Sequence, residues 1–186
     1  MPLYVIEHLE PHVYNWCKLE YTHISKRVGK ENLLFTNTAN IFLKTIGRVD
    51  KKKAKQLTFE KACVLDPDSS VLLTSAIAKK FEIFIFGGIL GDDPPKERTK
   101  VELSASDLPY PRFNLGKEQM STDTAVIVTK KIVDGTPLDK LTFQQGIEIE
   151  VNDSESVVLP YKYLVIDGTP LLAPGLVEKL KKQKGF

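Results

Sequence analysis

Residues 81–86 limit most strongly what this chain can fold into. Their sequence, Phe-Glu-Ile-Phe-Ile-Phe, is almost entirely apolar and runs straight into Gly87 and Gly88. A strand covered on both faces has this pattern, whereas a half-exposed strand alternates apolar and polar residues. The run is far shorter than the ~20 apolar residues that a membrane-spanning helix needs. The chain is therefore expected to contain a sheet whose two faces are both buried.

Other apolar runs and helical spacings alternate along the chain around this strand. Short strands are predicted at 3–6, 33–35, 62–65 and 112–115. Helices are predicted at 13–28, at 41–46 and at 124–133, where Ser121, Thr122 and Asp123 are candidate caps. Strands that alternate with helices indicate an α/β fold with a mostly parallel sheet.

The pattern changes after Pro137. Residues 147–151 alternate apolar and charged side chains, as a half-exposed strand does, and 157–166 follow as a second strand. A basic helix is predicted at about 176–182. We expect residues 1–137 to form the main domain and residues 138–186 to form a small hairpin-and-helix extension packed on it.

The composition fits a globular protein without an exceptional charge. The chain has 186 residues, of which 42% are apolar, with 26 basic and 24 acidic side chains. Cys17 and Cys63 are too few for a disulfide framework or a cysteine-based zinc site. Residues 1–7 are too short and too quickly charged for a signal peptide. We expect a cytoplasmic protein with no membrane segment and no metal.

The segment 86–95 reads Phe-Gly-Gly-Ile-Leu-Gly-Asp-Asp-Pro-Pro, with its glycines at the carboxyl end of the buried strand. Glycines there let a ligand approach the backbone closely. The segment has neither the Gly-Lys-Ser/Thr ending of a phosphate-binding loop nor the spacing of a dinucleotide fingerprint, and Asp92 and Asp93 would repel phosphate. A ligand without phosphates, such as the cationic S-adenosylmethionine, suits it better. The alternative is that the glycines only form a tight turn.

Several stretches together resemble the SPOUT methyltransferases, and in particular the subgroup of the fungal SPOUT-type protein arginine methyltransferase and its archaeal relatives. The resemblance covers most of the chain in the same order. It is carried by Ile6-Glu7-His8, Leu65-Asp66-Pro67, 86–92, Pro94-Pro95, Arg98-Thr99, Leu115-Gly116, Gln119-Met120 and Thr122-Asp123-Thr124-Ala125.

This resemblance implies a trefoil knot in the C-terminal part of the α/β domain and S-adenosylmethionine as the cofactor, with S-adenosylhomocysteine as product. It also tilts the expected state toward a monomer rather than the usual SPOUT dimer. Three cofactor loops are implied, with the binding residues Phe86, Gly87, Gly88, Ile89, Leu90, Gly91, Asp92, Leu115, Gly116, Gln119, Met120, Ser121, Thr122 and Thr124.

The expected catalytic residues follow from the chemistry of an arginine acceptor. A guanidinium is a poor nucleophile that stays charged, so a carboxylate must grip it and accept its proton. We expect Glu7 and Asp92 in this role and Arg98 as an orienting group. Asp93 and Asp123 are further candidates. A turn is the structural alternative for Asp92 and Asp93, and a helix cap is the alternative for Asp123. A surface ion pair is the alternative for Arg98.

The acceptor itself has more than one interpretation. An arginine of a ribosomal or translation-linked protein is favoured by the subgroup resemblance and the acidic loop. Residues 44–61 carry seven basic against two acidic side chains, a local excess that attracts RNA or a ribosomal protein on its RNA; the structural alternative is a solvated lysine face. An RNA methyltransferase acting on ribosomal or transfer RNA is therefore the first alternative. A non-catalytic module that binds the cofactor or RNA is the second.

Overall fold

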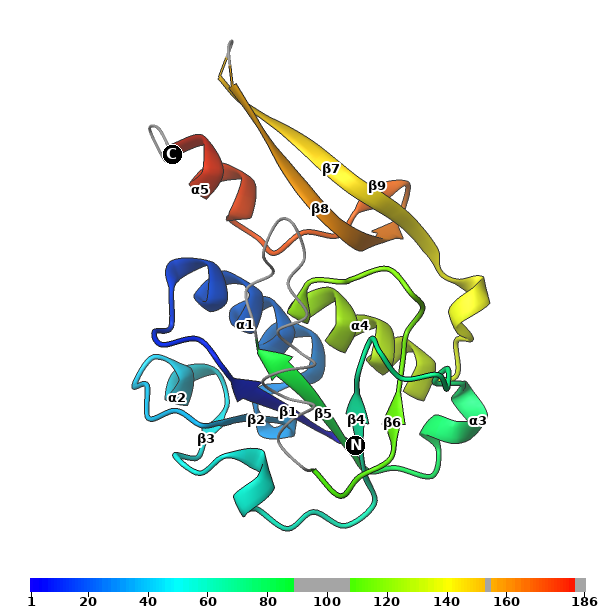
Figure 1. The fold of residues 1–186 in the computed structure, drawn as a ribbon. Helices are drawn as coiled ribbons and strands as arrows, with labels where there is room; N and C mark the ends of the chain where they lie inside the picture. Colours follow the sequence, from blue (N-terminus) through cyan, green and yellow to red (C-terminus); the bar gives the residue numbers. More distant parts are fainter. Residues whose placement is uncertain (89–107, 153–154, 183–186) are drawn as a thin grey trace.

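A parallel six-stranded sheet forms the centre of the molecule (Figure 1). The computed structural model describes residues 1–88, 108–152 and 155–182. The strand order is β3-β2-β1-β5-β4-β6, and every pairing between these strands is parallel. The strands are β1 (Leu3–His8), β2 (Leu33–Thr36), β3 (Arg48–Val49), β4 (Ala62–Leu65), β5 (Ile83–Gly88) and β6 (Arg112–Phe113).

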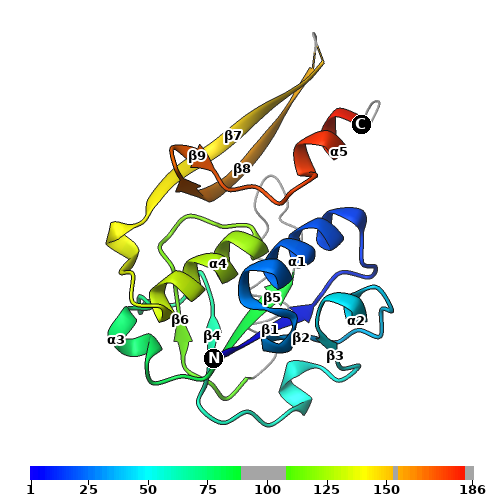
Figure 2. The same ribbon diagram turned by 180° about the vertical axis from the view of Figure 1, so that it is seen from behind.

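Two longer helices cover one face of this sheet, and Figure 2 shows them in front of the strands. These are α1 (Asn15–Val28) and α4 (Thr122–Val133). The shorter α2 (Leu43–Ile46) and α3 (Ser75–Ala78) complete the main part of the fold. The core between helices and sheet includes Tyr4, Ile6, Tyr21, Ile24, Phe84, Phe86, Val128 and Ile132.

The opposite face of the sheet is buried as well. Alternate residues of a strand point to opposite faces, so Val5 and Ile85 lie on the other side from Ile6 and Phe86. There they pack with Ala54, Val64 and Leu108. This two-sided burial explains why β5 is apolar at nearly every position. The predicted α/β fold with a mostly parallel sheet is confirmed.

The C-terminal part forms a second sheet that lies above the main domain in Figure 1. It consists of β7 (Thr142–Asn152), β8 (Glu155–Ile166) and β9 (Thr169–Pro170), paired antiparallel, followed by α5 (Leu176–Lys182). Its apolar cluster includes Leu159, Tyr163, Leu176 and Leu180, and Trp16 and Leu19 of α1 pack against it. The extension is thereby fastened to α1.

Several element boundaries differ from those predicted from the sequence. Strand β5 begins at Ile83 instead of Phe81, because Leu3 of β1 and Ala62 of β4 both begin opposite Ile83. At its other end β5 includes Gly87 and Gly88, which the sequence had placed in a loop. The sequence analysis did not identify β3 and α3, since two and four residues are too short to show a periodicity.

The predicted trefoil knot concerns residues 86–124, and 89–107 of these lie outside the described residues. The knot therefore stays a prediction, as does the domain boundary at 137/138. In the part of the chain that is described, no helix is both long and apolar enough to cross a bilayer.

Candidate active site

A hollow opens where three neighbouring strands of the main sheet end. Leu65 ends β4, Gly87 is near the end of β5, and Phe113 ends β6. Ligands of open α/β sheets commonly bind at this carboxyl edge. The hollow is about 660 Å³, including the part open to solvent. Its described lining residues are Leu65, Asp66, Pro67, Phe86, Gly87, Phe113, Leu115, Gly116, Glu118, Gln119, Met120, Thr122 and Ala125.

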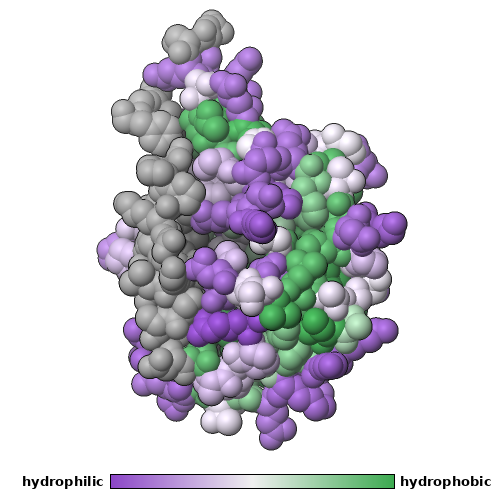
Figure 3. Space-filling model, turned by 45° about the vertical axis from the view of Figure 1, so that its right-hand side comes forward, coloured by the Kyte–Doolittle hydropathy of each residue, from purple (hydrophilic) through white to green (hydrophobic). Residues whose placement is uncertain are grey.

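The lining combines apolar walls with two carboxylates, each of which is paired with a basic side chain. Figure 3 brings the right-hand side of Figure 1 forward and shows a strip of apolar surface running up that side of the molecule beside polar side chains. Asp66 and Glu118 are the charged residues among the described lining, which includes no lysine or arginine. Asp66 accepts a hydrogen bond from Arg112 (Nη1–Oδ2 3.0 Å), and Glu118 accepts one from Lys162 (Nζ–Oε2 2.9 Å). These walls suit an apolar ring and a neutral or cationic group better than a phosphate.

The chain from Asn114 to Met120 forms one wall and is fixed at both ends. The Asn114 N–H donates to the carbonyl of Val71 (2.8 Å), and its side-chain oxygen accepts the Gly116 N–H (2.9 Å). Gly116 has φ +108°, a conformation that other residues rarely adopt. On the other side, the Lys162 N–H of β8 donates to the Gln119 carbonyl (2.8 Å). The extension therefore supports this wall directly.

The two adjacent glycines of β5 have different surroundings. Gly87 pairs with Glu7 and lines the hollow. Gly88 lies against α1, where an added Cβ would overlap the Tyr21 hydroxyl and come within 2.8 Å of the Ile6 side chain. Gly88 is thus required for the close packing of α1 on the sheet, whatever it contributes to a ligand.

His8 lies at the end of β1, beside these glycines. Its Nδ1 is 3.0 Å from the Tyr21 hydroxyl, and the side chain is buried. Burial lowers the pKa of His8 below its usual value, which favours the neutral imidazole. His8 is not among the described lining residues of the hollow. The His8 side chain packs against Tyr21 of α1.

The carboxylate of Glu7 is buried, and its Oε2 accepts the backbone N–H of Ala54 (2.9 Å). Burial raises the pKa of Glu7, and the Ala54 N–H and the charges of Lys53 and Lys55 oppose this shift. Glu7 is the register partner of Gly87 but is not among the lining residues. Its catalytic role stays a prediction.

The remaining predicted site residues divide into two groups. Gly88, Ser121 and Thr124 are next in sequence to lining residues without lining the hollow themselves. The predictions for Ile89, Leu90, Gly91, Asp92 and Arg98, and for the candidate Asp93, lie outside the described residues. The lining residues that the sequence analysis did not assign to the cofactor site include Phe113, Glu118 and Ala125.

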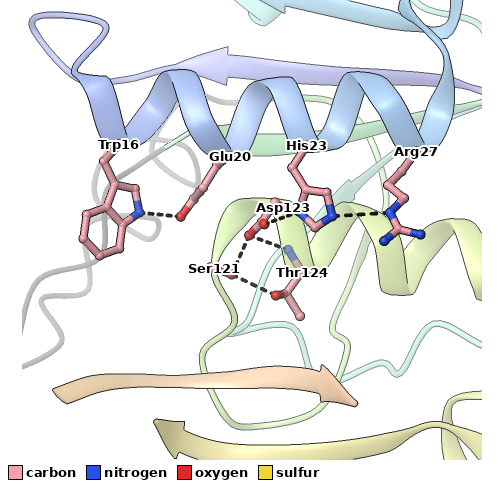
Figure 4. Close-up of polar contacts among 7 residues, drawn as sticks. All are labelled: Trp16, Glu20, His23, Arg27, Ser121, Asp123 and Thr124. Carbon is pink, nitrogen blue, oxygen red and sulfur yellow. Dashed lines mark hydrogen bonds and ion pairs between the residues drawn. The ribbon is translucent and has the colours of Figure 1, made fainter. Parts of the chain in front are cut away.

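A polar cluster with a buried centre joins α1 to the start of α4, and Figure 4 shows its residues. The Nδ1 of His23 lies 2.8 Å from Oδ2 of Asp123, and both side chains are buried. The Arg27 Nε–H donates to Nε2 of the same imidazole (3.3 Å). Because Nε2 accepts this bond, Nδ1 is the ring nitrogen that can donate to Asp123.

Within this cluster, the carboxylate of Glu20 on α1 lies at the N-terminal end of α4. Its Oε1 accepts the Trp16 indole N–H (2.8 Å), and the backbone N–H groups of Thr122 and Asp123 also bond its carboxylate. Burial and the nearby charge of Asp123 raise the pKa of Glu20 well above its usual value, against the opposing effect of these donors. Ser121 is the N-cap residue but makes no capping bond with its side chain, so Glu20 supplies the acceptor from another helix.

This cluster fixes the wall of the hollow that belongs to α4, since Thr122 is both bonded to Glu20 and part of the lining. Asp123 is not the N-cap residue, because it lies within the first turn of α4: its Oδ1 accepts the Thr124 N–H (2.9 Å) and its Oδ2 faces His23. The sequence contains a signal for this cluster that the sequence analysis did not use. The α1 members recur at helical spacing beside its apolar stripe, at Trp16, Glu20, His23 and Arg27.

Comparison with known proteins gives a consistent result. A family described as "Protein arginine N-methyltransferase SFM1-like" matches residues 3–185. The protein arginine N-methyltransferase SFM1 of Saccharomyces cerevisiae (strain ATCC 204508 / S288c) is 34% identical, and the match covers 96% of this chain and 94% of the yeast protein.

Solved structures agree with this match. The yeast SFM1 crystal structure complexed with SAM has a TM-score of 0.88 at 33% identity, covering 97% of this chain and 90% of that chain. The complex with SAH also has a TM-score of 0.88, at 32% identity, covering 96% and 94% of the two chains. A dual-specific Trm10 from Thermococcus kodakaraensis has a TM-score of 0.55 at 16% identity, covering 75% of this chain and 96% of that chain, and shares the fold alone.

Proposed function

Because this chain belongs to the SFM1-like family of protein arginine N-methyltransferases, we propose that it methylates an arginine of a ribosomal or translation-associated protein. The chain is an S-adenosylmethionine-dependent methyltransferase, and S-adenosylhomocysteine is its product. The observation that carries this assignment is the hollow at the ends of β4, β5 and β6, in a chain that superposes on the SAM complex of yeast SFM1 with a TM-score of 0.88.

The residues around the hollow fit this cofactor. Phe86, Leu115 and Met120 offer apolar walls for a flat adenine ring, and the backbone at Gly116 lets a ligand approach closely. The absence of lysine and arginine among the described lining residues agrees with a molecule that has no phosphate and carries a positive sulfonium. When bound, the cofactor supplies a methyl group that an acceptor nitrogen displaces in line.

The protein's own part in the reaction is alignment and proton removal. Holding two reactants in line supplies several kcal/mol of the rate enhancement. Glu7 is placed beside Gly87, and its raised pKa makes its carboxylate a stronger proton acceptor than an exposed glutamate. We assign Glu7 and Asp92 to gripping the guanidinium and accepting its proton, and Arg98 to orienting the acceptor.

Labelled methyl transfer tests this function. The chain is incubated with methyl-labelled S-adenosylmethionine and, separately, with ribosomal protein and ribosomal RNA fractions. The proposal expects label in protein, on arginine after acid hydrolysis, and a loss of about 100-fold or more in kcat for Glu7→Gln with unchanged cofactor affinity. Label in RNA alone would contradict the arginine acceptor and favour an RNA methyltransferase.

The proposed working state is a cytoplasmic monomer. The extension packs through its apolar cluster onto Trp16 and Leu19 of α1, so this stretch of helix is already covered within one chain. Light scattering at micromolar concentration checks the state. A mass of 20.9 kDa supports the monomer, and twice that mass contradicts it.

A further inference from the structure

A short basic segment, residues 48–55, follows α2 and lies outside the site described above. Its five basic side chains are all exposed: Arg48, Lys51, Lys52, Lys53 and Lys55. The segment includes β3, the outermost strand on one side of the sheet, and continues from the carboxyl end of this strand. Because the strands are parallel, all their carboxyl ends lie on the same side of the sheet. Lys51–Lys53 therefore lie on the same side as the hollow.

The backbone of the basic segment is held in place by hydrogen bonds. The carbonyls of Asp50 and Lys52 accept N–H groups of the chain after β2 (3.2 and 2.8 Å). The Lys53 N–H donates to the Gln56 side chain (2.9 Å), and the Ala54 N–H donates to Glu7 (2.9 Å). The lysines are thus presented from a fixed path whose end is tied to β1, next to Gly87.

Among the described residues, the basic side chains of this segment form no ion pairs with the carboxylates near them. Asp50 is its one acidic residue, and the Asp50 Oδ1 accepts the Lys52 backbone N–H (2.8 Å). Glu7 is likewise bonded to a backbone N–H. Within residues 1–88, 108–152 and 155–182, none of the five basic side chains takes part in an ion pair.

The type of exposed side chain in this segment distinguishes a protein partner from a nucleic acid. Protein interfaces are anchored by buried aromatic and arginine residues and are poor in lysine. Between these lysines the segment offers no exposed aromatic or large apolar side chain, since Ala54 is buried. Closely spaced lysines without apolar anchors match the regular charge of a phosphate backbone, and the lack of exposed rings disfavours stacking on single-stranded bases.

We propose that the basic segment is a docking surface for the phosphate backbone of structured RNA. Its position on the same edge as the hollow would let one RNA contact the segment while a protein bound to that RNA reaches the hollow. This last consequence rests on the proposed function, whereas the RNA contact itself does not.

Fluorescence anisotropy with the full chain and a fluorescein-labelled RNA hairpin tests the proposal. Three to five phosphate contacts predict an affinity that falls roughly 40- to 500-fold between 50 and 200 mM salt. The charge reversal Lys51→Glu/Lys52→Glu is expected to weaken binding at least tenfold. The matched control is Lys79→Glu/Lys80→Glu, which reverses two exposed lysines just before the amino end of β5, whereas Lys51 and Lys52 follow the carboxyl end of β3.

The outcomes separate the alternatives. Loss with the first pair and near wild-type binding with the second supports the proposal. It is overturned by no binding at 50 mM salt, by equal loss in both variants, or by tighter binding to a poly-glutamate peptide than to the hairpin. Cofactor affinity measured by calorimetry should be unchanged in both variants, which excludes misfolding. Because this binding assay involves no methyl transfer, a negative result would not contradict the proposal that arginine is the methyl acceptor.

Discussion

The α1–α4 interface and the basic segment use titratable side chains in opposite ways. At the interface Glu20, His23 and Asp123 are buried, and each makes hydrogen bonds within the protein. In the basic segment, residues 48–55, the charges are exposed and the nearby carboxylates bond to the backbone instead. Buried polar groups with partners fix a structure, whereas exposed charges without partners contribute little to it. The first region therefore shapes the hollow, and the second is free to meet a partner.

The comparison is tested most severely by removing the Glu20 carboxylate. Glu20→Ala leaves the Trp16 indole and the first N–H groups of α4 without their acceptor in a buried place. We expect a loss of about 3 kcal/mol in the free energy of unfolding, because each orphaned donor costs about 1–3 kcal/mol and water replaces part of it. Urea denaturation measures the loss. A change below about 1 kcal/mol would mean that the interface tolerates unpaired groups.

Glu20→Gln sharpens the same point through pH. The folded-state pKa of Glu20 is raised, so the folded protein holds this proton more tightly than the unfolded chain does. Its contribution to stability is complete below the unfolded pKa and is lost as pH rises through the folded pKa. The free energy of unfolding of the wild type should therefore fall as the pH rises from the unfolded pKa of Glu20 to its folded pKa. In the variant, the free energy of unfolding should depend less on pH, as measured by denaturation at several pH values. Identical slopes would contradict the raised pKa.

Lys162 provides a smaller effect at the wall of the hollow. Lys162→Met removes the ion pair with Glu118 but leaves the backbone bond to Gln119. We expect cofactor binding to weaken roughly threefold, since exposed ion pairs contribute little. Lys130→Met is the control, because it removes a pair with Asp134 at the far end of α4. Equal affinities in the two variants would show that the extension does not tune the wall through this side chain.

The smallest effect is expected in the basic segment. Lys51→Ser/Lys52→Ser removes two exposed charges without ion pairs, so the free energy of unfolding should change by less than about 0.5 kcal/mol. Thermal denaturation checks this. A larger loss would place these lysines among the structural residues and end the contrast between the two regions.

The elements with a strong hydrophobic pattern could be predicted from the sequence. Strand β5 and helix α1 were found because an apolar run and a helical spacing are local signals. The hollow was partly predicted, through Gly87, Gly116 and Met120, because the resemblance located these stretches. The meeting of Glu20 with Asp123 was not predicted, since it joins residues 103 positions apart through tertiary packing. The role of Gly88 depends on Tyr21 and likewise appears only in three dimensions.

The central claim, that the hollow beside β5 binds S-adenosylmethionine, is tested most directly by isothermal titration calorimetry. The protein should bind one equivalent, and Gly116→Val should abolish binding. Gly135→Val is the matched control, because Gly135 has a similar φ of +102° against +108°, has no atoms within 4 Å of an added Cβ, and is not among the lining residues. The account predicts binding in wild type and in the Gly135 variant only. No heat with wild type, or undiminished affinity with Gly116→Val, would contradict it.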